Sequence, residues 1–80
     1  MIIHLINPFE YGTNKQWDLI IEENGLQILR QTITFNSDVT DAELESFSID
    51  YFNAQNYLDE ENNPIAYTEI IIDKPEDWNN

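Results

Sequence analysis

The chain has 80 residues, the size of one small domain, and we expect a single domain over residues 1–80. Its 16 Asp and Glu against three Lys and Arg give a formal net charge of −13, which disfavours direct binding to DNA, RNA or an anionic membrane. The chain has no cysteine, which excludes disulfides and thiolate metal sites, and 41% hydrophobic residues suffice for a packed core.

Three strands are expected in the first half of the chain. Residues 2–6, IIHLI, form a short apolar run that Asn7-Pro8 ends, and residues 9–14 are predicted as a loop. Residues 15–23 alternate in polarity, and after an Asn-Gly hairpin signal residues 26–35 return as a β-branched strand. The start lacks a basic signal-peptide segment, and no apolar run approaches about 20 residues, so we expect a cytoplasmic protein.

Two registers are possible for the second hairpin. A two-residue loop would pair Leu19 with Arg30, whereas a three-residue loop with Gly25 as a bulge would pair Leu19 with Leu29. The second register is favoured because it gives Arg30 an acidic neighbour, Asp18, and collects six apolar residues on one face. Those six residues are Trp17, Leu19, Ile21, Leu29, Ile33 and Phe35.

The clearest local signature is a helix start within residues 39–44, VTDAEL. Thr40 is the expected N-cap and Glu43 completes a capping box. Val39 and Leu44 have the spacing of a hydrophobic staple across this cap. The sequence therefore predicts that the helix begins directly after Thr40.

The predicted helix runs to about residue 58 or 59, and Asn62-Asn63-Pro64 stops it. A last strand is expected at residues 65–73, followed by a tail that contains Trp78. The expected fold class is α+β, with a small, mostly antiparallel sheet of three to four strands in the order β-β-β-α-β packed on one long helix.

Helical periodicity divides the aromatic residues of the predicted helix into two groups. One stripe is expected to face the core, namely Leu44, Phe47, Tyr51, Ala54 and Leu58. Ile49 and Phe52 lie outside it. They are either covered by a loop or the Trp78 tail, or exposed to bind a partner.

The acidic residues are unevenly distributed. Residues 38–80 hold twelve acids and one base, whereas residues 1–37 hold four acids and two bases. Residues four apart on a helix rise about 6 Å, so Asp41 and Glu45 have a separation similar to that of successive phosphates. The candidate partner-binding residues are the carboxylates of this half with two aromatic anchors: Asp41, Glu45, Asp50, Phe52, Tyr57, Asp59, Glu60 and Glu61.

The sequence offers little for catalysis. His4 is the one histidine and lies in a strand-like run, where a structural or surface role is typical. There is no cysteine nucleophile and no glycine-rich phosphate loop. Residues 59–61 and 36–38 could collect a hard cation, but neither has the spacing of a calcium loop. We therefore expect no enzymatic activity, no cofactor and no metal site.

In size and composition the chain resembles the small acidic inhibitors of phages and mobile elements, which include DNA-mimicking anti-CRISPR and anti-restriction proteins and uracil-DNA glycosylase inhibitors. This resemblance assigns no residue roles. It implies a protein that occupies the basic nucleic-acid-binding surface of a nuclease, glycosylase or CRISPR effector. The alternative is a small structural or accessory module that self-associates as a homodimer or larger assembly, such as a phage assembly or immunity protein, through edge strands such as residues 65–72.

Overall fold

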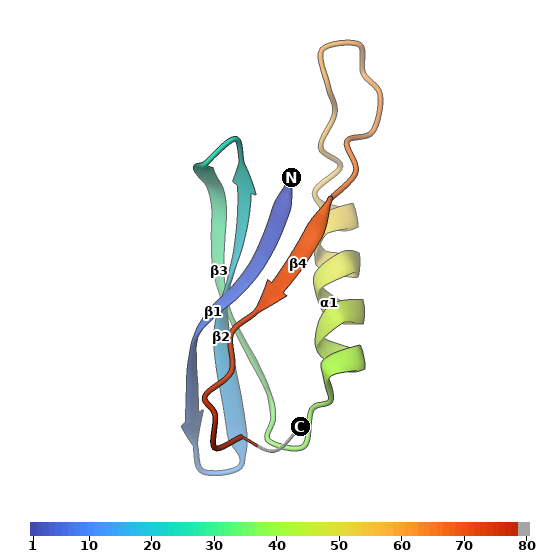
Figure 1. Cartoon of the computed structure of the whole chain (residues 1–80). Helices are drawn as coiled ribbons and strands as arrows, with labels where there is room; N and C mark the ends of the chain where they lie inside the picture. The colour runs from blue at the N-terminus through green and yellow to red at the C-terminus, as the bar shows by residue number, and fades with distance from the viewer. Residues whose placement is uncertain (79–80) are drawn as a thin grey trace.

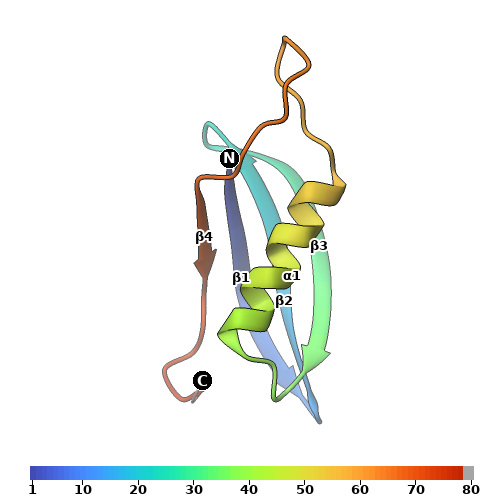
Figure 2. The same ribbon diagram turned by 90° about the vertical axis from the view of Figure 1, so that its right-hand side faces the viewer.

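The computed structural model describes residues 1–78 of the chain. The elements are β1 (Ile2–Tyr11), β2 (Asn14–Glu23), β3 (Leu26–Asn36), α1 (Asp41–Ala54) and β4 (Glu69–Ile72). The predicted order β-β-β-α-β is confirmed, and the fold is a small α+β fold. Figures 1 and 2 show α1 lying over one face of the sheet, while the loop that follows α1 projects beyond both layers.

The sheet is mixed, so the expectation of a mostly antiparallel sheet is wrong. The strand order is β3-β2-β1-β4; both hairpins are antiparallel, and β4 runs parallel to β1. β2 already lies between its two hairpin partners, so β4 can join the sheet only outside β1 or β3. Because α1 returns the chain to the end where those two strands begin, either position makes β4 parallel to its neighbour (Figure 1).

β1 is longer than predicted, and the loop predicted at residues 9–14 is wrong for residues 9–11, which belong to β1, and for Asn14, which begins β2. The β1–β2 register shifts between Ile6 and Phe9, and Asn7 has a positive φ of 54°. Asparagine tolerates this left-handed conformation, and an irregularity in the ladder accommodates Pro8, which has no N–H to donate. Asn7-Pro8 therefore bends the strand without ending it.

The β2–β3 hairpin has neither of the two expected registers. Asn24-Gly25 forms a two-residue turn, and both residues have positive φ, 52° and 81°, as a type I′ turn requires. An additional residue, Ile28, then shifts the ladder so that Ile21 pairs with Leu29. A shift of one residue exchanges the faces of a strand, and this shift restores the face expected for the six apolar residues.

The hydrophobic core lies between the sheet and α1. Leu29, Ile33 and Phe35 of β3 pack against it at its margin. Its fully covered members come from β1, β2, α1 and the residue before the helix cap: Ile3, Leu5, Trp17, Leu19, Ile21, Val39, Leu44 and Phe52.

The predicted helix start is confirmed. The backbone N–H of Glu43 donates to Thr40 Oγ1 at 3.2 Å, and the backbone N–H of Thr40 donates to Glu43 Oε1 at 3.0 Å. The Thr40 hydroxyl also donates to Glu43 Oε1 at 3.0 Å, and the bonds donated by the backbone N–H and the hydroxyl of Thr40 hold the pKa of the Glu43 carboxyl below its usual value. Val39 and Leu44, the expected staple, are both buried in the core cluster.

The helix has 14 residues and ends earlier than predicted. Asn56 adopts a positive φ of 54°, a conformation common just beyond a helix C-terminus. The Gln55 side chain donates to the carbonyl of Tyr51 at 3.2 Å and occupies one of the terminal acceptors. The expected continuation to residue 58 or 59 is therefore wrong, and within residues 1–78 no helix is long and apolar enough to cross a membrane.

The buried face of α1 is rotated from the predicted stripe. Leu44, Ser48 and Phe52 are buried, whereas Phe47 is 36% exposed and Ala54 and Leu58 are exposed. Ser48 can be buried here because its hydroxyl donates to the carbonyl of Leu44 at 2.8 Å. A serine in the middle of the packed face is the reason that the hydrophobic pattern indicated the wrong stripe.

Candidate partner-binding surface

Phe52 belongs to the core, and the expectation that it forms an exposed anchor is wrong. Its side chain is 3% exposed, and its ring lies 5.6 Å from that of Tyr57 and 6.0 Å from that of Tyr67. The segment after α1 therefore covers Phe52. Trp78 lies elsewhere, 5.5 Å from the ring of Trp17.

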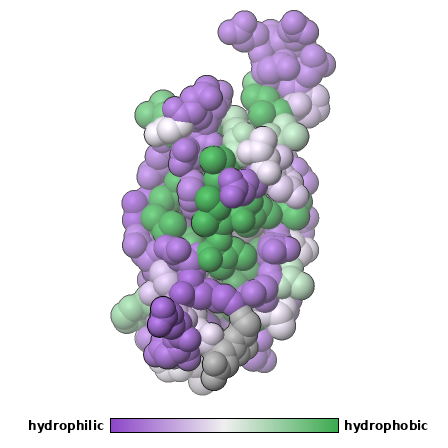
Figure 3. All heavy atoms as spheres, viewed as in Figure 1, coloured by the Kyte–Doolittle hydropathy of each residue, from purple (hydrophilic) through white to green (hydrophobic). Residues whose placement is uncertain are grey.

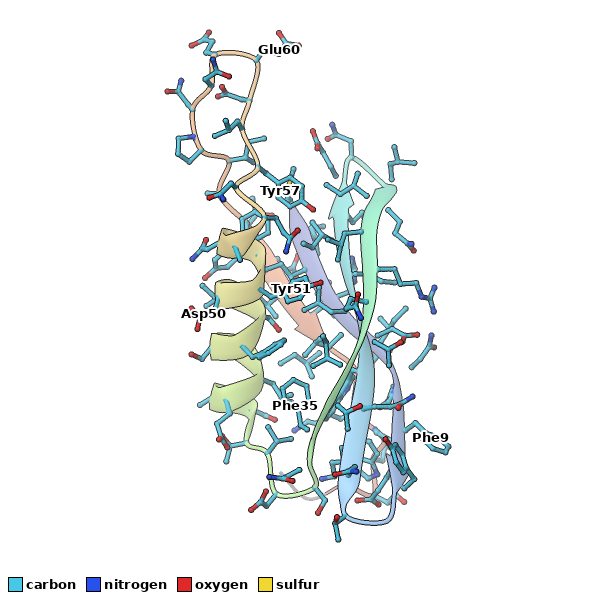
Figure 4. The ribbon with its side chains drawn as sticks, turned by 180° about the vertical axis from the view of Figure 1, so that it is seen from behind. Phe9, Phe35, Asp50, Tyr51, Tyr57 and Glu60 are labelled. Carbon is cyan, nitrogen blue, oxygen red and sulfur yellow. The ribbon has the colours of Figure 1, made fainter. Side chains whose placement is uncertain are left out.

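Tyr57, the second predicted anchor, lies at the base of the loop rather than on the helix. It is half-buried, and this burial raises the pKa of its hydroxyl, with a smaller contribution from Tyr51. Figure 4 shows Tyr57 directed toward the sheet. Tyr57 therefore supports the loop and offers only part of its ring to a partner.

The acidic residues of α1 lie on two different sides. At about 100° per residue, Asp41 and Glu45 share one flank and Asp50 lies on the far side. Asp41 Oδ1 accepts from Lys74 Nζ at 2.7 Å. The phosphate-like pair of Asp41 and Glu45 thus has one of its two charges compensated, while Glu45 and Asp50 are exposed and Asp50 points away from the sheet (Figure 4).

The acidic loop, defined here as residues 56–65, projects from the end of α1 and holds its own shape (Figure 1). Leu58 and Pro64 form a β-bridge, and the backbone N–H of Ile65 donates to the Tyr57 carbonyl at 3.0 Å. At the tip, Asp59 Oδ1 accepts from the backbone N–H groups of Glu61 and Asn63 at 2.8 and 2.9 Å. Figure 3 shows that the outer end of the loop is hydrophilic.

The eight predicted site residues do not form one site. The fold gathers Asp59, Glu60 and Glu61 at the tip of the acidic loop, with Glu60 at its outermost turn (Figure 4). The helix carboxylates lie below this tip on two sides of α1, in a molecule whose principal extents are 45 × 21 × 17 Å. The negative charge is therefore spread over the tip of the acidic loop and two sides of α1 instead of being gathered in one pocket.

All three cationic side chains of the chain are engaged within the fold. Arg30 Nη2 lies 2.7 Å from Asp18 Oδ2, and Lys74 is bound to Asp41. Lys15 is 6% exposed, and its ammonium lies 4.8 Å from the centroid of the Trp78 ring. Each positive charge faces a group of the same chain, and the net charge is −13, so the outward electrostatic field of the molecule is negative.

The outer face of the sheet, opposite α1, carries polar pairs among isoleucines. Asp18 accepts hydrogen bonds from Asn7, Thr32 and Arg30, and the three bonds, that from Asn7 first, lower the pKa of its carboxyl. His4 Nε2 lies 2.9 Å from Glu22 Oε1. The carboxylates of Asp18 and Glu22 on this face are thus both held by neighbouring side chains.

Two exposed aromatic residues were missed in the sequence analysis. Phe9 is 55% exposed and Tyr11 is 44% exposed, and their ring centroids lie 5.7 Å apart near the β1–β2 turn. Their spacing of two residues is the signal of a strand face, which was disregarded because Asn7-Pro8 was taken as the end of the strand. Phe9 extends away from the body of the molecule (Figure 4).

A hollow beside the start of α1 is open and has polar residues in its lining. Its volume is about 380 Å³, and Asn36, Asp38 and Glu43 are among its lining residues. Within residues 1–78, no group of three or more His, Cys, Asp or Glu side chains could hold a metal ion. Comparison of the chain with protein-family models, curated proteins and solved structures finds no match.

Proposed function

We propose that this protein is a non-enzymatic cytoplasmic inhibitor that binds the basic nucleic-acid-binding surface of another protein. The partner would be a nuclease, a glycosylase or a CRISPR effector, and the carboxylates of α1 and the acidic loop would take the place of a nucleic-acid backbone. Such a role requires neither a cofactor nor a metal ion.

The observation that carries the proposal is the engagement of every cation while exposed carboxylates are left on a projecting loop. Arg30, Lys74 and Lys15 all contact groups of the same chain, and Arg30 and Lys74 each lie 2.7 Å from a carboxylate, which offsets their repulsion of a basic partner. The hydrogen bonds of Asp59 order the loop before binding, which reduces the entropy lost on association.

Charge supplies steering and association rate more than affinity, so an apolar anchor is also needed. The exposed rings of Phe9 and Tyr11 now fit this role better than Phe52, which is buried. They lie away from the acidic loop, and a partner that contacts both regions would have to span the length of the sheet.

The test is retention of nucleic-acid-binding proteins on the immobilised protein, with purified nucleases, a uracil-DNA glycosylase and a CRISPR effector as the panel. Glu60→Lys with Glu61→Lys should abolish retention, because these charges lie at the exposed tip. The matched control is Glu23→Lys with Glu76→Lys, which makes the same charge change at two other exposed sites.

A retained partner should be released by salt and displaced by duplex DNA, and the protein alone should not shift DNA in a gel. Retention that is equal for both double variants and insensitive to DNA would contradict the proposal.

A second candidate, a small self-associating structural or accessory module such as a phage assembly or immunity protein, is favoured by the open edges of the sheet. The two candidates respond oppositely to salt. Screening weakens attraction to a basic partner but favours association between copies that each carry −13.

A further inference from the structure

The outer edge of β3 has no partner strand among residues 1–78. β3 lies at the end of the strand order, and its ladder is formed with β2 alone. The backbone hydrogen bonds outside helices and strands involve none of residues 26–35. Apart from the Thr32 carbonyl, which accepts a long hydrogen bond of 3.4 Å from Gln31 Nε2, residues 26–35 of this 11-residue strand have no backbone partner on their outer side among the described residues.

This edge also lacks the features that usually prevent strand pairing. Natural edge strands are shortened, or carry Lys, Pro or inward-pointing charges. β3 has neither Lys nor Pro, and its single irregularity, at Ile28, lies near the turn and leaves the rest of the edge regular.

The charge of β3 is unlike that of the rest of the molecule. Residues 24–37 contain no Asp or Glu, although 16 of the 80 residues are acidic. The one charged residue in this segment is Arg30, and Asp18 compensates it at 2.7 Å. Two copies of a protein with a charge of −13 repel each other over most of their surfaces, and this neutral edge is where they can approach.

A partly exposed apolar margin accompanies the edge on the α1 side. Phe35 of β3 lies 5.2 Å from Phe47, which in turn stacks on Tyr51 at 6.0 Å. Figure 4 shows Phe35 and Tyr51 between α1 and β3, while Asp50 points away from this seam. A strand added to β3 would carry its own apolar face against this margin.

We infer that β3 pairs with β3 of a second copy in antiparallel orientation, which extends the sheet across a two-fold axis. Several registers would keep the apolar faces of both copies on the same side of the extended sheet. Of these, the register centred on Gln31 puts Leu29 opposite Ile33 of the other copy and Arg30 opposite Thr32. A register centred on Arg30 is disfavoured, because it would put two like charges directly opposite each other. This inference does not rest on the proposed function.

Sedimentation velocity over a range of concentrations tests the pairing. The dimer should be favoured when ionic strength rises from about 0.1 M to about 1 M, since the Debye length falls from about 10 Å to about 3 Å. Gln31→Glu should weaken dimerisation by about fivefold, because it places two carboxylates opposite each other. Gln31→Lys should weaken it similarly, since any charge at the axis meets itself.

Gln27→Glu is the matched control, because it adds the same charge to the same strand away from the axis and should have a smaller effect. The chain has no cysteine, so Gln31→Cys should form a disulfide-linked dimer under oxidation while Gln27→Cys should not. A protein that stays monomeric at both ionic strengths, or whose dimer is weakened equally by Gln31→Glu and Gln27→Glu, would overturn the inference.

Discussion

The two edges of the sheet are built from opposite residue choices. β4 has four residues, carries an exposed carboxylate at Glu69, and is followed by Asp73 and Pro75. β3 has eleven residues and no acidic side chain. The short edge has the features that resist pairing, and the long edge does not.

This difference shows that a large net charge need not prevent self-association at every part of a protein surface. On the β4 side, the acidic loop leads into β4, which begins with the exposed Glu69 (Figure 1), so an acidic molecule is repelled there. On the β3 side, Arg30 is paired with Asp18. The approach of a second copy to this edge therefore depends mainly on whether the two strand backbones can align. The two proposed interactions, with a basic partner and with a second copy, would therefore use different edges of the sheet.

The largest expected effect is a loss of stability from the core on the β4 side of the molecule. Phe52→Ala removes a buried ring that contacts Tyr57 and Tyr67, so it should lower the free energy of unfolding by about 3–5 kcal/mol. Phe47→Ala, which truncates a ring 36% exposed on the β3 side, should cost roughly 1–2 kcal/mol. Urea unfolding measures both values, and equal losses would show that the two flanks of α1 are equally buried.

A smaller effect is expected where the chain passes from the β3 side into α1. Thr40→Ala removes the side-chain acceptor of the capping box and should destabilise the fold by about 1 kcal/mol. Thr40→Ser keeps a hydroxyl at this position and serves as the control in thermal unfolding. The cap would not contribute to stability if Thr40→Ala melted at the same temperature as the unaltered protein.

An effect no larger than that of Thr40→Ala is expected on the outer face of the sheet, where β2 lies beside β3. Asp18→Asn should cost about 1 kcal/mol at pH 7, because it weakens charge-assisted bonds from Asn7, Thr32 and Arg30. The pKa of Asp18 in the folded protein lies below its ordinary value of 3.8. Its contribution is therefore present above pH 3.8 and is lost as the pH falls through the folded-state pKa.

Unfolding curves at several pH values should show the difference between the unaltered protein and Asp18→Asn shrinking in acid. Asp50→Asn is the control, because it removes one charge from the outer side of α1. A difference that stayed constant down to low pH would show that the Asp18 carboxylate is not the stabilising group.

Local features of the fold could be predicted from the sequence. The capping box depends on Thr40 and Glu43, which are three residues apart, and such a signal does not need the rest of the chain. The inward face of the second hairpin was also predicted correctly, since periodicity fixes a face even when the register is wrong by two residues. The parallel β4 could have been deduced, because two tight hairpins leave no antiparallel position for it.

Other features depend on contacts of the folded chain that the hydrophobic periodicity of the sequence does not reveal. Ser48 breaks the apolar pattern of α1, and its bond to the Leu44 carbonyl exists only once the helix has formed. The site was predicted less well for a similar reason. The compensation of Asp41 by Lys74 joins residues 33 positions apart, so the sequence alone could not show which carboxylates are paired with a cation.

The parallel pairing of the first and last strands also sets the response of the molecule to tension. The chain enters β1 at one end of the sheet and leaves β4 at the other, and backbone bonds join them from Thr68 and Met1 to Asp73 and Leu5. A force applied across the two ends would slide these strands past each other and load all of their hydrogen bonds together, in shear. A force perpendicular to these strands would peel them apart and break the bonds one after another. The fold should therefore resist force best along the line between the start of β1 and the end of β4.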